Sequence, residues 1–81
     1  MGITAQYKAE SELLDKKIKA HSTLRTMTDK TFNITVYILE CNLWGVFFKD
    51  WAYTKEQTYQ NARTFYRAVK KKQDAILHWY R

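Results

Sequence analysis

A long amphipathic pattern in the last third of the chain constrains the fold more than any other feature. It begins with Thr54-Lys55-Glu56-Gln57, which matches a capping box: the Thr54 hydroxyl is expected to accept from the Gln57 amide while the Gln57 side chain bonds back to Thr54. Apolar residues then recur at helical spacing on one stripe, namely Tyr59, Ala62, Tyr66, Val69, Ile76 and Tyr80. We therefore expect a helix from Thr54 towards the end of the chain, long enough to be the scaffold of an 81-residue domain.

A second helix is expected near the start of the chain, from about Thr4 to Leu24. Its apolar stripe consists of Ile3, Tyr7, Leu14 and Ile18. The pattern weakens after Ala20, where serine, threonine and histidine become frequent, and these residues are unfavourable inside helices. The sequence therefore defines the last residue of this helix only to within several positions.

The middle of the chain supports two interpretations. From Phe32 to Ile38, apolar and polar residues alternate with a period of two, and a second run rich in strand-forming residues follows at Trp44–Phe48. With a turn at Asn42 and a bulge at Gly45, these runs form a β-hairpin. The other interpretation is one buried helix from about Thr31 to Trp51. Alternation and β-branching favour the hairpin.

The hairpin predicts an α+β fold, a single domain over residues 1–81 with helix–hairpin–helix order. Two long helices would pack on one face of a two-stranded antiparallel sheet. Tyr37 and Leu39 are expected on the second face, where they would favour a homodimer through that face or a sheet edge. The buried middle helix predicts instead an all-α three-helix bundle.

The charge balance favours an acidic partner. Fourteen Lys and Arg residues against eight Asp and Glu give a formal net charge of +6. Such an excess is typical of proteins that bind nucleic acid, anionic lipid or an acidic protein surface. A net charge of this size also keeps small domains soluble as monomers, which is an equally good explanation for it. The basic residues are spread along the chain and are not concentrated in a tail.

The strongest indication of a binding site is a basic face on the C-terminal helix. Helical spacing places Arg63, Arg67, Lys70 and Lys71 opposite the apolar stripe. Cations in such a row can follow the phosphates of a nucleic acid and release counterions. The alternative is an ordinary solvated face, which the helix dipole also favours near a C-terminus.

The competing hypothesis is an accessory or inhibitory protein that docks on another protein through exposed aromatic residues. Aromatic residues make up 16% of the chain, which is high. Trp79 projects away from the apolar stripe of the last helix, and Trp44 is the second candidate anchor. Aromatic residues at strand or helix spacing more commonly belong to a core.

Neither an enzyme nor a metal or cofactor site is expected. The chain has one cysteine, Cys41, and two histidines, His21 and His78, with no local pattern that pairs a nucleophile with a base. Metal-ligand spacings and a phosphate-binding glycine loop are missing from the sequence.

The sequence favours a cytoplasmic protein with a reduced Cys41. The first ten residues lack the apolar core of a secretory signal. The most apolar stretch, Ile34–Phe48, contains Glu40 and is shorter than the roughly 20 residues that a membrane-spanning helix needs, so a membrane partner is not expected.

Overall fold

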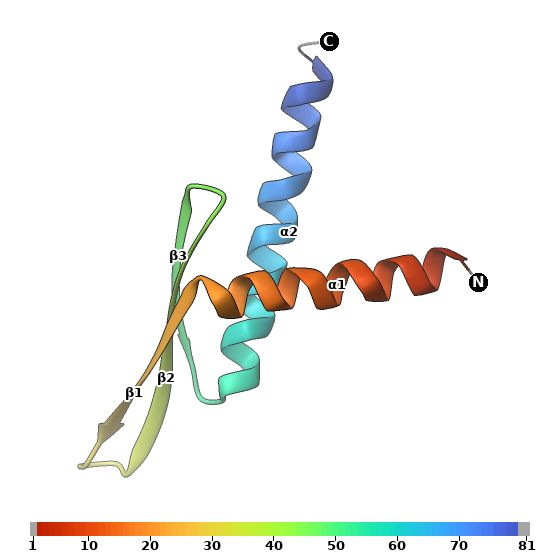
Figure 1. The fold of residues 1–81 in the computed structure, drawn as a ribbon. Coiled ribbons are helices and arrows are strands. Elements are labelled where there is room, and N and C mark those ends of the chain that lie inside the picture. The colour runs from red at the N-terminus through yellow and green to blue at the C-terminus, as the bar shows by residue number, and fades with distance from the viewer. Residues whose placement is uncertain (1, 80–81) are drawn as a thin grey trace.

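The computed structural model describes the backbone of residues 2–79 and the side chains of residues 8–76. Helix α1 (Gly2–Ala20) is followed by strands β1 (Ser22–Asp29), β2 (Ile34–Leu43) and β3 (Val46–Ala52), and then by helix α2 (Lys55–Trp79). The strands form one antiparallel sheet in the order β1-β2-β3 (Figure 1). The predicted α+β class is confirmed, and the three-helix bundle is wrong because the middle of the chain is a sheet.

The predicted two-stranded sheet is also wrong, because β1 adds a third strand. This strand pairs with β2 from Ser22 opposite Cys41 to Asp29 opposite Ile34. Most of its side chains are exposed, so it lacks the alternation of apolar and polar residues that marks a half-buried strand. Its threonines suit a strand, but it is the ladder with β2 that makes this segment extended.

The hairpin of β2 and β3 turns later than expected. Leu43 and Val46 close the ladder, and the two residues between them have positive φ angles, 57° at Trp44 and 74° at Gly45. Such pairs form the mirror-image turn that matches the twist of a hairpin. The predicted turn at Asn42 is wrong, since Asn42 lies within β2, and Gly45 belongs to the turn rather than to a bulge.

The register gives the sheet a covered and an uncovered face. On β2, Leu39, Cys41 and Leu43 are buried against the helices. Tyr37 shares this side, because side chains alternate along a strand. The expectation that Tyr37 and Leu39 lie on the uncovered face is therefore wrong, and that face carries the intervening residues, such as Ile38, instead.

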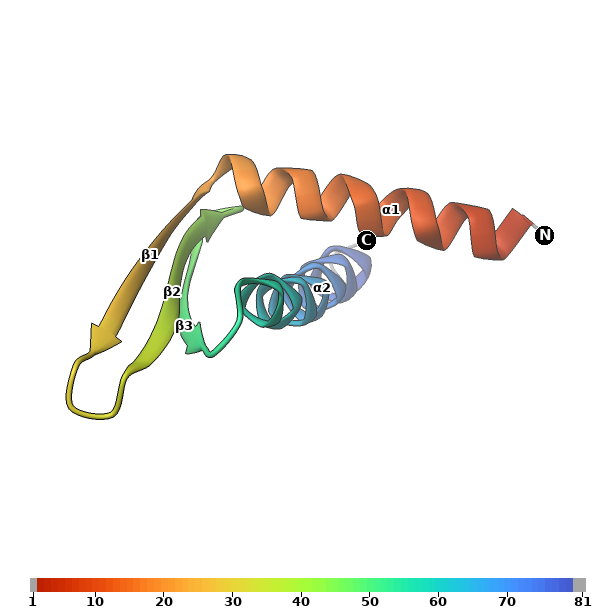
Figure 2. The ribbon, with the colours of Figure 1, turned by 90° about the horizontal axis from the view of Figure 1, so that it is seen from below.

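Both helices pack on the covered face of the sheet, as Figure 2 shows. The core joins Leu14 and Ile18 of α1 to Tyr59, Ala62 and Tyr66 of α2 and to the buried side chains of β2. The Tyr66 side chain is fully buried, and its hydroxyl lies 3.0 Å from the Cys41 carbonyl oxygen and 2.7 Å from that of Val46. Tyr66 thus anchors α2 to both strands of the hairpin.

At the start of α2, one of the two hydrogen bonds of the predicted capping box is present. The Thr54 hydroxyl oxygen accepts a hydrogen bond from the Gln57 amide at 3.2 Å, which confirms the cap. The Gln57 side chain does not return to Thr54, because it donates to the Asn61 Oδ1 atom at 2.8 Å. Asn61 in turn donates to Asp50 of β3 at 3.1 Å. The first turns of α2 are therefore tied to the sheet.

The two helices extend beyond the core. The Cα radius of gyration is 15.5 Å, whereas a compact domain of this length has about 12 Å. Figure 1 shows the cause, since α1 and α2 cross near the sheet and the N-terminal part of α1 and the C-terminal part of α2 then project from it. The projecting helices leave an open angle between them.

Candidate functional site

A cleft of about 150 Å³ opens where α1 crosses α2. Its apolar lining is made by Leu13 and Leu14 of α1 and by Trp44 at the hairpin turn. The other residues that line it are polar or charged: Glu10, Ser11, Lys17, Arg67 and Lys70. Three cations and one carboxylate thus share the cleft with an apolar lining.

Trp44 is held in place in the lining of this cleft. Its ring meets the Tyr66 ring edge to face, with centroids 5.9 Å apart and planes at 86°. The Lys17 Nζ atom lies 6.0 Å from the centre of the Trp44 ring, within the range of a cation–π contact. Trp44 is half-buried, so it is part of the framework of the cleft and not the freely exposed anchor that the docking hypothesis expects.

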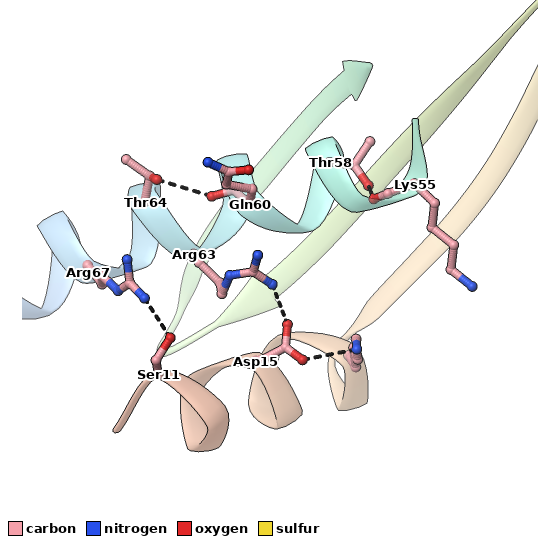
Figure 3. Close-up of polar contacts among 9 residues, drawn as sticks. Ser11, Asp15, Lys55, Thr58, Gln60, Arg63, Thr64 and Arg67 are labelled. Carbon is pink, nitrogen blue, oxygen red and sulfur yellow. Dashed lines mark hydrogen bonds and ion pairs between the residues drawn. The ribbon is translucent and has the colours of Figure 1, made fainter. Parts of the chain in front are cut away.

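An ionic clamp joins the helices beside the cleft. The Arg63 Nη1 atom donates to the Asp15 Oδ1 atom at 2.6 Å (Figure 3). Lys19 Nζ lies 2.9 Å from Asp15 Oδ2. Partial burial acts to raise the pKa of Asp15, but hydrogen bonds from Lys19 and Arg63 outweigh it and hold that pKa below its ordinary value. Both side chains of the clamp are largely shielded, with exposed fractions of 20% for Arg63 and 24% for Asp15.

The four predicted cations of α2 do not share one solvated face. Arg63 and Arg67 both point towards α1, and Arg67 donates to the Ser11 hydroxyl oxygen at 2.7 Å (Figure 3). Arg67 and Lys70 line the cleft, whereas Lys71 is exposed farther round the helix. The structure therefore brings Arg67, Lys70 and Trp44 together, and it assigns Arg63 to the clamp.

Sequence reasoning missed the contribution of α1 to this site. Lys17 and the pair Leu13 and Leu14 belong to the cleft because α1 lies across the cationic flank of α2. A basic residue on the first helix was visible in the sequence, but nothing in its spacing says which side of α2 that helix covers. The second predicted anchor, Trp79, has a side chain outside the described residues.

A second surface feature lies on the uncovered face of the sheet. Exposed or half-buried apolar side chains gather there at the end remote from the Trp44–Gly45 turn: Met27, Ile34, Val36, Ile38, Trp51 and Tyr53, here called the outer apolar patch. The rings of Trp51 and Tyr53 meet edge to face, with centroids 5.3 Å apart. Beside the patch, Glu40 pairs with Arg25 and lies 3.6 Å from Lys49.

The remaining candidate groups are dispersed. Cys41 is buried, and its thiol lies 3.8 Å from the Ile18 carbonyl oxygen. Burial raises the pKa of this thiol, which disfavours the reactive thiolate. His21 is exposed at the junction of α1 and β1, and the side chain of His78 falls outside the described residues. Within the part of the chain that the structure describes, no three His, Cys, Asp or Glu side chains gather as metal ligands would.

None of the helices in the described part of the chain is long and apolar enough to cross a bilayer. Comparison with protein-family models, curated proteins and solved structures finds no match to this chain.

Proposed function

We propose that this chain is a non-catalytic binding protein whose ligand is a nucleic acid, contacted at the cleft between α1 and α2. The observation that carries the proposal is the convergence of Lys17, Arg67 and Lys70, from two helices, around one concave site. Lys71 continues the basic surface along α2. The phosphate oxygens of a nucleic acid are the ligand chemistry that such cations favour.

The charge distribution supports a polyanion over a single small anion. The cleft has three cations against the carboxylate of Glu10, and the chain as a whole carries +6. A single anion would use the cleft alone, whereas a phosphate backbone would also reach Lys71. Arg63 is left out of the proposed contacts, because Asp15 already neutralises it inside the clamp.

The same geometry supports weak sequence preference. Two of the three cations are lysines, flexible point charges without the fixed, paired donors that distinguish bases, and the guanidinium of Arg67 already donates to Ser11. Trp44 has Lys17 against its ring and Tyr66 at its edge, so it favours a role in shaping the cleft over stacking on a base. Binding should therefore be governed by phosphate contacts.

A salt titration with random duplex and single-stranded oligonucleotides tests the proposal. On duplex DNA, log K should fall with log salt by roughly 0.9 per phosphate contacted, so two to four contacts give a slope of about −2 to −4. If neither the duplex nor the single-stranded oligonucleotide binds detectably at low salt, nucleic acid is excluded as the ligand.

The second candidate function is docking on another protein, with an apolar protein surface as the partner of exposed aromatic residues. Its support is the outer apolar patch, where Trp51 and Tyr53 are 53% and 63% exposed. Under this hypothesis Trp51→Ala should abolish partner binding while Arg67→Ala changes it little, because aromatic anchors dominate protein interfaces.

A further inference from the structure

We infer that the outer apolar patch is the contact surface for a second copy of this chain, packed sheet face against sheet face. The patch lies across all three strands, with Met27 on β1, Val36 and Ile38 on β2, and Trp51 on β3. Met27 is 61% exposed and Trp51 is 53% exposed, although both belong to regular strands. The helices cover only the opposite face (Figure 2).

The charges on this face favour a second copy over an acidic partner. The face carries two cations, Arg25 and Lys49, and two carboxylates, Glu40 and Asp29, so it has no net charge although the chain carries +6. Arg25 and Lys49 both lie against Glu40, which leaves one positive charge that Asp29 balances on the face as a whole. A neutral face neither repels its own copy nor attracts a polyanion, and the basic cleft stays on the other side of the sheet.

The size of the face predicts a weak, reversible dimer. Three strands about 4.8 Å apart, each about seven residues long at 3.4 Å per residue, give a face of roughly 350 Å². Stable interfaces bury about 800 Å² on each partner, and weak encounters bury less. The face contains a hollow lined by Ile34, Val36 and Tyr53, which apolar side chains of a facing copy can enter. Such packing resembles a β-sandwich, whose sheets lie about 10 Å apart.

Sedimentation of the full chain over a concentration series up to about 1 mM tests the inference. The wild type should pass from monomer to dimer, and high salt should not weaken the association, because the buried surface is apolar and neutral. A wild type that stays monomeric throughout, or a dimer that dissociates as salt rises, would overturn the inference. Nucleic-acid binding should weaken with salt, so the two proposals fail independently.

Two variants locate the interface, and a third is the matched control. Trp51→Lys and Met27→Lys each place a cation in the patch and should remove the dimer, with circular dichroism to verify the fold. Two variants are used so that a folding defect in one does not decide the result. Ile76→Lys introduces the same charge at a residue of α2 that is 52% exposed, and it should dimerise as the wild type does. An equal loss of dimer in Ile76→Lys, or persistence of the dimer in the folded patch variants, would contradict the assignment.

Discussion

Arg63 and Asp15 form a short ion pair, 2.6 Å between Nη1 and Oδ1, that joins α2 to α1 across 48 positions of sequence. The two helices otherwise meet over a small area, because they cross and diverge (Figure 1). The pair joins the helices where they cross, together with the Arg67–Ser11 hydrogen bond and the apolar contacts of Leu14 and Ile18 with α2. Beside the pair, Lys17 of α1 and Lys70 of α2 line the same cleft.

The clamp should have a measurable coupling energy. In a double-mutant cycle of Asp15→Ala and Arg63→Ala, urea denaturation should give a coupling of about 1 kcal/mol, because the pair is largely shielded and charge-assisted. The matched control is the Glu40–Lys49 pair, whose atoms are 3.6 Å apart and whose side chains are more exposed. That pair should give roughly 0–0.5 kcal/mol, and equal couplings for the two pairs would contradict the structural role of the clamp.

The clamp also predicts a loss of stability in acid. Asp15 has a folded-state pKa below its ordinary value of 3.8, so the unfolded chain binds the proton more tightly. The stabilisation is therefore fully present above the unfolded pKa and is lost as the pH falls through the folded pKa. Between about pH 5 and pH 2, the free energy of unfolding should fall less in Asp15→Asn than in the wild type. Glu12→Gln, an exposed acid of the same helix, is the control and should retain the wild-type slope.

The Thr54 cap predicts opposite effects for one substitution at two places. Thr54→Ala should lower the free energy of unfolding by about 0.5–2 kcal/mol, because the Gln57 amide loses its acceptor. Thr64→Ala lies in the exposed interior of α2, where alanine is the better helix former, and should be neutral or raise stability by up to about 0.7 kcal/mol. Denaturation midpoints compare the two, and the same change in both would show that the cap contributes nothing.

If the proposed nucleic-acid contacts exist, removing any one of their cations should make the affinity less dependent on salt. Lys70→Ala and Arg67→Ala should each lower affinity about equally for all oligonucleotide sequences and should reduce the salt slope by about one. Lys30→Ala removes the same charge from the exposed loop between β1 and β2 and should leave the slope unchanged. Identical effects of Lys30→Ala and Lys70→Ala would mean that net charge alone, and not the cleft, binds the ligand.

Local signals were enough to predict several elements. The capping threonine and the stripe through Tyr59, Ala62 and Tyr66 placed α2, because helical periodicity is decided within a few turns of the chain. Alternation and β-branching from Phe32 to Ile38 likewise placed the hairpin. The excess of positive charge belongs to composition alone and does not depend on the fold.

Tertiary structure decided the rest. β1 is mostly exposed and polar, so it is a strand only because β2 offers a pairing edge. Arg63 lies on the polar side of α2 in any helical projection, yet it is shielded because α1 crosses there and presents Asp15. The depth of Trp44 in the cleft follows from a turn two residues later than expected and from the position of Tyr66. Periodicity along one element reports which face is apolar, whereas the neighbour that covers a polar face is chosen by packing between elements far apart in the sequence.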